Sequence, residues 1–277
     1  MSTFIRLTDY KSSDEKEQGF FKPENRYVAK QEDFEKIPGS PIAYWVSDRV
    51  KEIFKKSKNV SNLFESGGRI KTHNNEAFLR LFWEIEKKAI QNNNWKFYEN
   101  GGESIKWYGN KVNIVNWSEE ALLEYKSHGG LTDKRFWSTT GITWSIISTN
   151  DTYFRLKSND SEFSSGSPTI FLKNEESYLY YLSMLNTNFY KNILKITAPT
   201  INTSVGDVLR LPIIFSKSEI TKQTIGTLTQ ECIDISKEEW DSRETSWDFT
   251  CNELLKHKTD SKIENAFNAY CSYWREK

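Results

Sequence analysis

Apolar residues recur three or four positions apart in several stretches of this chain, which predicts helices that bury one face. Asn74 or Asn75 is suited to cap one of them, because a short amide side chain accepts hydrogen bonds from the first free backbone amides. The stretches with helical spacing are 42–56, about 75–90, 119–127 and 175–196. They predict amphipathic helices spread along the first two thirds of the chain.

Between these helices the apolar runs are short, broken by glycine and β-prone, which is typical of strands and hairpins. The strand-like stretches are 95–117, 141–148, 168–172 and part of 198–214, where Gly206 and Asp207 predict a turn. Beyond residue 217 the sequence becomes helix-prone. We therefore predict a mixed α/β fold in three parts: a helical lead-in (1–65), an α/β domain of short strands and packed helices (66–216) and a helical C-terminal segment (217–277).

The composition indicates a packed chain whose charge is balanced overall. Aromatic residues make up 14% of the 277 residues, with 10 Trp, so disorder over most of the length is not expected. Lys and Arg number 38, as do Asp and Glu, and the net charge is zero. Because an electrostatic nucleic-acid binder normally carries an excess of positive charge, any DNA contact should come from a local patch. Residues 67–117, with 8 bases against 5 acids, are the best candidate, whereas 217–277 hold 9 bases against 12 acids.

Sequence signatures of common enzymes are missing. The sequence has no glycine-rich dinucleotide or phosphate loop, no paired-histidine zinc motif and no nucleophile elbow. Its three cysteines lack paired spacing and its three histidines are far apart, so we expect neither a metal site nor a disulfide framework. The first residues lack the apolar core of a signal peptide, and no apolar run approaches membrane-spanning length. A cytoplasmic protein is expected, without a catalytic site, cofactor or metal in this chain.

Several strings spread over nearly the whole chain resemble one known family. They are 23–27 (PENRY), 37–45 (IPGSPIAYW), 71–78 (KTHNNEAF), 106–110 (KWYGN), 141–144 (GITW), 198–213 (APTIN through VGD to LPI) and 239–249 (EWDSRETSWDF). They are similar to the C-terminal part of the PglX family, the adenine-specific DNA methyltransferases of BREX phage-exclusion systems. That family is related to the TaqI-like and MmeI-like methyltransferases. The resemblance implies a TaqI-like target recognition domain, flanked by helical segments, in a phage-defence or restriction–modification protein.

The chain departs from the family pattern in two ways. Relatives commonly carry glycine at the position of His73, so a glycine-dependent backbone conformation is in question there. The tetrapeptide that holds a flipped adenine and the glycine-rich loop for S-adenosylmethionine are missing, and in the family both lie upstream. The resemblance therefore implies that S-adenosylmethionine binds in a catalytic domain outside this chain, and that this chain alone is inactive.

The resemblance implies that the chain binds duplex DNA so that an adenine can be flipped and methylated by the upstream domain. The DNA-contact candidates are Arg69, Lys71, Lys106 and Lys111 for phosphates or guanine, Asn74, Asn110 and Asn202 for adenine edges, and Ser145 and Thr200 for backbone or bases. Structural roles remain alternatives: Asn74 as a helix cap, Thr200 and Asn202 as turn caps, and Trp107, Trp144 and Trp247 as core anchors.

A competing function is a protein-interaction module that docks other BREX subunits, with Trp240 and Trp247 as hot spots. A tryptophan-rich carbohydrate binder is a third class, which the resemblance disfavours.

Overall fold

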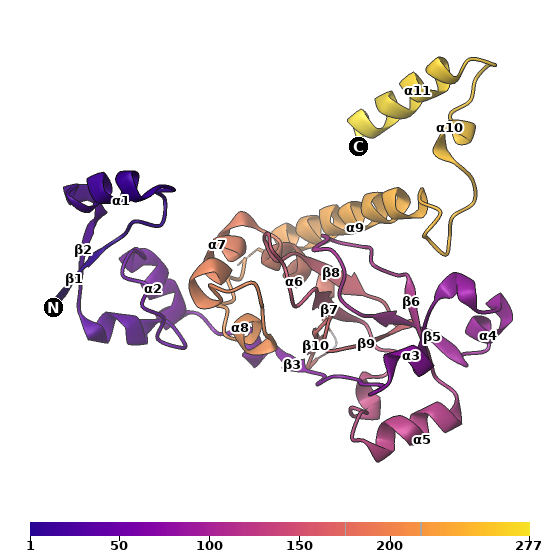
Figure 1. Ribbon diagram of the computed structural model, residues 1–277, viewed down its shortest axis with the longest axis horizontal. Helices are drawn as coiled ribbons and strands as arrows, with labels where there is room; N and C mark the ends of the chain where they lie inside the picture. Colours follow the sequence, from indigo (N-terminus) through magenta and orange to yellow (C-terminus); the bar gives the residue numbers. More distant parts are fainter. Residues whose placement is uncertain (175, 217) are drawn as a thin grey trace.

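The computed structural model describes residues 1–174, 176–216 and 218–277. Figure 1 shows a small N-terminal lobe at one end, two sheets with helices around them in the middle, and a C-terminal helical segment along one side. The mixed α/β fold expected from the sequence is confirmed. Short 3-10 helices occur at Pro23–Asn25, Gln31–Lys36, Val60–Asn62, Phe82–Glu84 and Lys134–Phe136.

The N-terminal lobe pairs strand β1 (Ser2–Ile5) antiparallel with β2 (Arg26–Ala29), with helix α1 (Ser13–Phe20) between them in sequence. Helix α2 (Asp48–Lys56) follows. The expected helix over 42–56 is therefore wrong in its first part. Residues 42–46 form turns instead, because the buried side chains of Ala43 and Val46 join the core while Tyr44 stacks on Phe4 at 4.6 Å between ring centroids.

The first large sheet is antiparallel and has the strand order β3 (Phe64–Ser66), β10 (Thr169–Leu172), β7 (Gly141–Trp144) and β8 (Phe154–Lys157). Helices α6 (Tyr178–Leu185), α7 (Asn188–Thr197) and α8 (Val205–Leu209) contribute to the core that it forms. Trp144 lies fully buried in this core, and its indole nitrogen donates to the Thr203 carbonyl at 2.8 Å. The expected strands at 141–148 and 168–172 are thus present in shorter form.

The second large sheet has the strand order β4 (Leu79–Leu81), β6 (Asn113–Asn116), β5 (Trp95–Glu99) and β9 (Ser161–Phe163), with β5 and β9 parallel. Helices α3 (Asn75–Phe78), α4 (Lys87–Gln91) and α5 (Glu119–Ser127) lie around it. The helix predicted over 119–127 is confirmed, and Ser118 caps it by accepting from the Ala121 amide.

The single helix predicted over 75–90 is wrong. Asn74 does cap a helix, but α3 lasts one turn before the chain becomes strand β4 and then a 3-10 turn. Pairing of β4 with β6 places Leu79 opposite Val115, and Phe82 is buried with the neighbouring Phe97. These sheet contacts override a local pattern that has helical spacing.

The long helix predicted over 175–196 is divided into α6 and α7, and its predicted start at residue 175 lies outside the described residues. The break is at Asn186, whose amide accepts from the Phe154 amide at 3.0 Å and donates to the Phe154 carbonyl at 2.8 Å. Residues 198–214 also differ from expectation. Helix α8 replaces the predicted turn at Gly206 and Asp207, and isolated bridges from Asn202 and Pro212 replace the predicted β segment.

The C-terminal segment begins with the long helix α9 (Glu219–Asp241), which packs on α6. Helices α10 (Glu253–Lys256) and α11 (Ile263–Glu276) follow, and Glu238 of α9 accepts from the Tyr273 hydroxyl of α11 and from Lys277, the residue after α11. Trp240 is only 7% exposed, and Trp247 packs edge-on against Phe82 and Phe97. Because Trp240 is buried, it cannot be the exposed interaction hot spot that the sequence suggested.

No described helix has both the length and the apolarity needed to cross a bilayer. The boundaries at 65/66 and 216/217 stay predictions, and residue 217 is outside the described residues.

Candidate nucleic-acid interface

The extended segment between β3 and α3 carries two neighbouring cationic side chains. Gly67 lets this segment lie against the core, because a Cβ there would come within 2.4 Å of Phe171. Ile70 is fully buried and its amide donates to the Phe163 carbonyl at 3.2 Å, whereas Arg69 before it is exposed and Lys71 after it is half-buried. Ile70 therefore anchors the segment in the core, while Lys71 and Arg69 on either side of it each line a pocket at the surface.

Arg69 and Lys71 line two adjoining pockets, which we call the polar cleft. Both pockets include Ser164 and Ser165 of the loop after β9. The first is lined by Ile70, Lys71, Thr72, His73, Asn75, Tyr98, Asn100, Ser164 and Ser165, and the second by Gly68, Arg69, Ile146, Ser164, Ser165, Pro168, Ser204 and Val205. No Asp or Glu is among these described lining residues. The cleft therefore combines two cations with hydroxyl and amide groups, a composition that suits an anionic, hydrogen-bonding ligand.

Neither Arg69 nor Lys71 forms a side-chain hydrogen bond or ion pair with another residue that the structure describes. Other cations of the α/β region are engaged: Lys96 pairs with Glu162 at 3.1 Å, and Arg135 pairs with Glu65 at 2.8 Å. Their positive charge is partly neutralised inside the fold. Arg69 and Lys71 thus retain positive charge toward the cleft.

Backbone geometry at His73 is of the kind that favours the glycine expected there from the family resemblance. Its φ of 59° is in the left-handed region, which glycine adopts without the steric cost that a side chain brings. The ring of His73 lies 5.5 Å from that of His128 on α5, and His73 also lines the polar cleft. This sequence therefore keeps the glycine-like backbone conformation with a histidine in place.

A short antiparallel ladder connects the segment that contains Asn202 to Ile146 at the cleft. The Ser148 amide donates to the Ile201 carbonyl at 2.9 Å and the Thr203 amide to the Ile146 carbonyl at 2.8 Å. Since Ile146 and Ser204 line the second pocket, the exposed Asn202 is positioned near its rim. The Thr200 hydroxyl accepts from the Asn202 amide at 3.3 Å and donates to its carbonyl at 3.1 Å, which is the turn-capping alternative.

Asn74, at the entrance of α3, is exposed, but its side-chain oxygen accepts from the Ala77 amide at 3.1 Å. This is the helix-cap alternative, and it occupies part of the amide's hydrogen-bonding capacity. The side-chain amide of Asn202 has no hydrogen-bond partner among the described residues. Of these two asparagines, Asn202 is therefore the one whose side-chain amide is more available to hydrogen-bond with the edge of a base.

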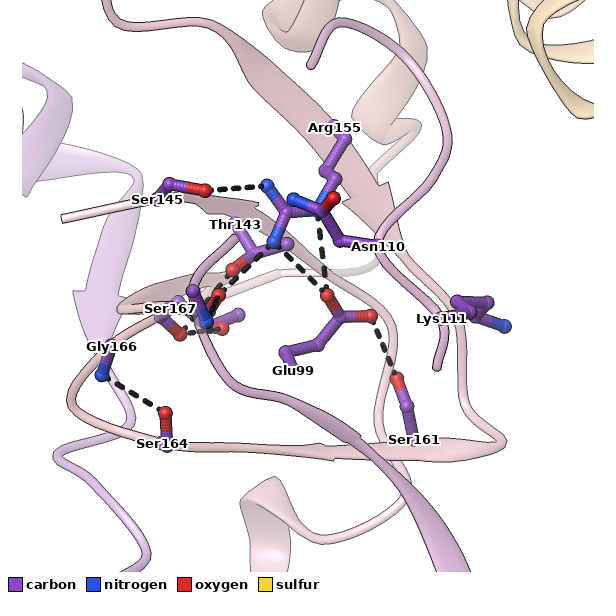
Figure 2. A network of polar contacts seen from close by, with 12 residues as sticks. Glu99, Asn110, Lys111, Thr143, Ser145, Arg155, Ser161, Ser164, Gly166 and Ser167 are labelled. Atoms are coloured by element: carbon purple, nitrogen blue, oxygen red, sulfur yellow. Dashed lines mark hydrogen bonds and ion pairs between the residues drawn. The ribbon is translucent and has the colours of Figure 1, made fainter. Parts of the chain in front are cut away.

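Two other candidates, Ser145 and Asn110, lie in a buried polar network beneath the surface (Figure 2). The Ser145 hydroxyl donates to the Glu103 carbonyl at 3.0 Å, and the Asn110 side chain donates to the same carbonyl at 2.8 Å. At the centre of the network, the Arg155 guanidinium, 1% exposed, binds the Glu99 carboxylate at 3.2 Å. Ser145 and Asn110 accordingly hold the backbone at Glu103 in place. Both side chains are buried, which separates them from the open cleft.

The remaining cations, Lys106 and Lys111, are away from Arg69 and Lys71. Lys111 binds the Asp160 carboxylate at 2.8 Å and the Ser158 hydroxyl at 2.6 Å. Burial raises and Lys111 lowers the pKa of Asp160, and the net result is a lowered pKa. Lys106 lies over the Tyr153 ring at 4.8 Å and lines a separate pocket next to α9 and α11. Of the nine candidates, Arg69 and Lys71 line the polar cleft, and Asn202 lies two residues before Ser204 in its lining.

Several important residues gave no signal in the sequence. Arg155 and Lys157 alternate along β8 like solvent-facing residues, yet both are buried. Burial lowers the pKa of Lys157 to about 8, while its ammonium group donates to the Thr139 carbonyl at 2.8 Å. Ser164 and Ser165 stand in an obvious polar loop, and Ser165 is exposed as such a loop predicts, whereas Ser164 is only 4% exposed. Their place beside Arg69 depends on tertiary structure.

Within the described residues there is no group of three or more His, Cys, Asp or Glu side chains arranged to hold an ion. The three cysteines, Cys232, Cys251 and Cys271, are free thiols.

Comparison with known proteins finds two curated relatives. The chain is 32% identical, in an alignment of 301 residues, to the adenine-specific methyltransferase PglX of Lacticaseibacillus casei (strain Zhang), covering 98% of this chain and 24% of that protein. It is 29% identical over 255 residues to the adenine-specific methyltransferase BrxX of Escherichia coli O9:H4 (strain HS), covering 88% of this chain and 20% of that protein. The chain thus spans about a quarter of the length of these relatives.

No family model matches the chain. Among solved structures, it is similar to the Type IIL restriction-modification enzyme MmeI in complex with DNA, with a TM-score of 0.46 and 11% sequence identity. That match covers 78% of this chain and 33% of the MmeI chain.

Proposed function

Because this chain matches one part of the adenine-specific methyltransferases PglX and BrxX over nearly its whole length, we propose that it supplies the DNA-recognition part of such an enzyme. An enzyme that methylates adenine must take the base out of the duplex, and it needs further contacts to choose the site. The upstream methyltransferase domain would perform the transfer. This chain would hold the duplex and select its sequence.

The observation that carries the proposal is the pair of unneutralised cations at the polar cleft. Arg69 and Lys71 come from the same segment and line adjoining pockets, and Ser164 and Ser165 line both of these pockets. Phosphate contacts by Arg and Lys fix the position of a protein on the duplex, whereas hydrogen bonds to base edges provide sequence specificity. We assign the first role to Arg69 and Lys71 and the second to Asn202, with Thr200 and Asn74 as neighbouring structural supports.

S-adenosylmethionine is the methyl donor expected for methyltransferases such as the two relatives. The residues around the polar cleft do not fit this cofactor, because nucleoside cofactors are commonly held through their ribose hydroxyls by a carboxylate, and the described lining residues supply none. We therefore place cofactor binding and methyl transfer in the upstream domain.

Salt-dependent binding to duplex DNA tests the proposal. We expect the wild-type chain to bind a mixed-sequence duplex with an affinity that falls as salt rises, and the double variant Arg69→Ala/Lys71→Ala to bind more weakly. Each lost phosphate contact should reduce the slope of log affinity against log salt by about 0.9, so the double variant should lose about 2 units of slope. Fluorescence anisotropy at several salt concentrations measures both quantities.

The matched control is Lys55→Ala/Lys258→Ala, which removes the same charge from exposed positions on α2 and before α11. It should retain the wild-type slope. Duplex affinity that does not change with salt would contradict DNA recognition and favour the alternative, in which this surface docks other BREX subunits. Equal slopes for both double variants would remove Arg69 and Lys71 from the interface.

A further inference from the structure

Ile147 is a large apolar side chain that is 58% exposed beside the polar cleft. It forms an isolated antiparallel bridge with Asn202. The two flanking hydrogen bonds, from Ser148 to Ile201 and from Thr203 to Ile146, make the bridge a non-hydrogen-bonded pair. In such a pair the two side chains lie on the same face with Cα atoms about 4.5 Å apart.

The two members of this pair have complementary chemistry. Asn202 is exposed, and its side-chain amide has no partner in the described part of the chain, so it can offer one donor and one acceptor in a plane. Ile147 offers only apolar surface. The backbone ladder fixes their separation, which limits the entropy lost when both engage one ligand.

An A·T base pair presents the matching pattern in the major groove. Adenine shows the N7 acceptor next to the N6 donor, which asparagine can bind through two hydrogen bonds, and thymine shows its C5 methyl group, which accepts apolar contact. A G·C pair would put the O6 acceptor of guanine where Asn202 needs a donor, and it has no methyl group for Ile147. We propose that Ile147 and Asn202 together read an A·T base pair, Asn202 on the adenine and Ile147 on the thymine methyl.

This inference rests on the proposed DNA-recognition function and makes it specific. It assigns a base-reading role to Ile147, which no charge or motif in the sequence indicates. It also gives Asn202 a defined partner base. Arg69 and Lys71 would hold the backbone nearby, because the segment that carries Asn202 continues directly to Ser204 at the edge of the same cleft.

Sequence selection followed by single-atom changes in the DNA tests the assignment. The wild-type chain is first used to select bound sequences from a random duplex library, and we expect at least one fixed A·T pair. At that pair, deoxyuridine then replaces thymidine, which removes only the methyl group, or 7-deazaadenine replaces adenine, which removes only N7. Affinities are measured for wild type, Ile147→Ala and Asn202→Ala.

For wild type, loss of the methyl group should weaken binding about fourfold, which corresponds to about 0.8 kcal/mol for one buried methyl group. Ile147→Ala should bind the thymidine and deoxyuridine duplexes equally. Loss of N7 should weaken wild type about fivefold or more, and Asn202→Ala should show no such difference. The exposed residues Leu123 on α5 and Asn268 on α11 provide matched controls, and Leu123→Ala and Asn268→Ala should keep both wild-type penalties.

The outcomes separate the two proposals. If wild type shows no salt-dependent duplex binding, both the DNA-recognition function and the A·T assignment fail. If binding is salt-dependent and weakened by Arg69→Ala/Lys71→Ala, but the methyl penalty persists in Ile147→Ala or the N7 penalty persists in Asn202→Ala, only the A·T assignment is overturned. Selection of sequences without a fixed A·T pair overturns it as well.

Discussion

At the scale of single residues, burial changes the chemistry of groups that the sequence presents as ordinary surface charges. Lys157 follows Arg155 by two positions in β8, so both lie on one face of the strand, and that face is buried. Arg155 is paired with Glu99, whereas Lys157 donates to the backbone carbonyls of Thr139 and Ser158. Carbonyl groups compensate a charged ammonium group less than a carboxylate does, which explains why burial lowers the pKa of Lys157 to about 8.

The lowered pKa predicts that the fold gains stability in mild alkali. Between pH 8 and about 10.5 the unfolded chain keeps a proton on Lys157 that the folded chain has released, so the unfolded state binds more protons and stability rises with pH. Wild type should gain up to about 2 kcal/mol of unfolding free energy from pH 7.5 to 9.5 relative to Lys157→Met. Urea denaturation of both proteins at the two pH values measures the difference. An equal pH dependence in the two proteins would show that Lys157 stays charged in the fold.

At the scale of helices and strands, one buried side chain decides where a long helical pattern ends. Asn186 closes α6 and reaches across to β8, where it satisfies both the amide and the carbonyl of Phe154. Phe154 is fully buried, so water cannot replace these two bonds. A sequence with helical spacing on both sides gives no sign of this contact.

We expect Asn186→Ala to lower the free energy of unfolding by about 1–3 kcal/mol, because it leaves the buried Phe154 amide unpaired, while the Phe154 carbonyl keeps its bond from the Trp107 amide at 3.0 Å. Asn188→Ala, two positions along on exposed surface at the start of α7, is the matched control and should change stability by less than about 1 kcal/mol. Thermal or urea unfolding followed by circular dichroism measures both. If the two variants are equally stable, the Asn186 bridge contributes nothing to holding α6 against the sheet.

Elements that depend on local signals could be predicted, whereas those that depend on distant partners could not. Helix α5 begins after a serine cap and carries acids in its first turn, and its bounds agree with the prediction. The helix predicted at the position of β4 is wrong because Leu79 and Leu81 pair with residues of β6, which come more than 30 residues later in the chain. Local spacing cannot reveal such a partner. The same applies to the site: the charges of Arg69 and Lys71 were visible in the sequence, but the neighbouring position of Ile147 and Asn202 arises from a ladder between distant segments.

At the scale of the whole molecule, the zero net charge is consistent with the localised DNA contact that we propose. The 38 basic and 38 acidic side chains balance, and pairs such as Lys111 with Asp160 neutralise cations inside the α/β region. For the DNA-recognition function that we propose, this balance predicts weak long-range attraction to DNA, so that specificity would come from local contacts such as those of Asn202. A recognition part of this kind suits an enzyme whose other domains add affinity.

If another domain carries out catalysis, as we propose, this chain alone should neither bind S-adenosylmethionine nor transfer a methyl group. Its polar cleft has cations and hydroxyl groups on described residues but no carboxylate for a ribose, and the sequence lacks the motifs that hold the cofactor and the flipped adenine. Isothermal titration of the chain with S-adenosylmethionine should give only the heat of dilution, with the full-length PglX relative as the positive control. Saturable binding to this chain would contradict the prediction and would locate part of the cofactor site within residues 1–277. Duplex binding is measured separately, so that result would not bear on Arg69 and Lys71. Their roles are tested by the salt dependence of duplex binding in the Arg69→Ala/Lys71→Ala variant.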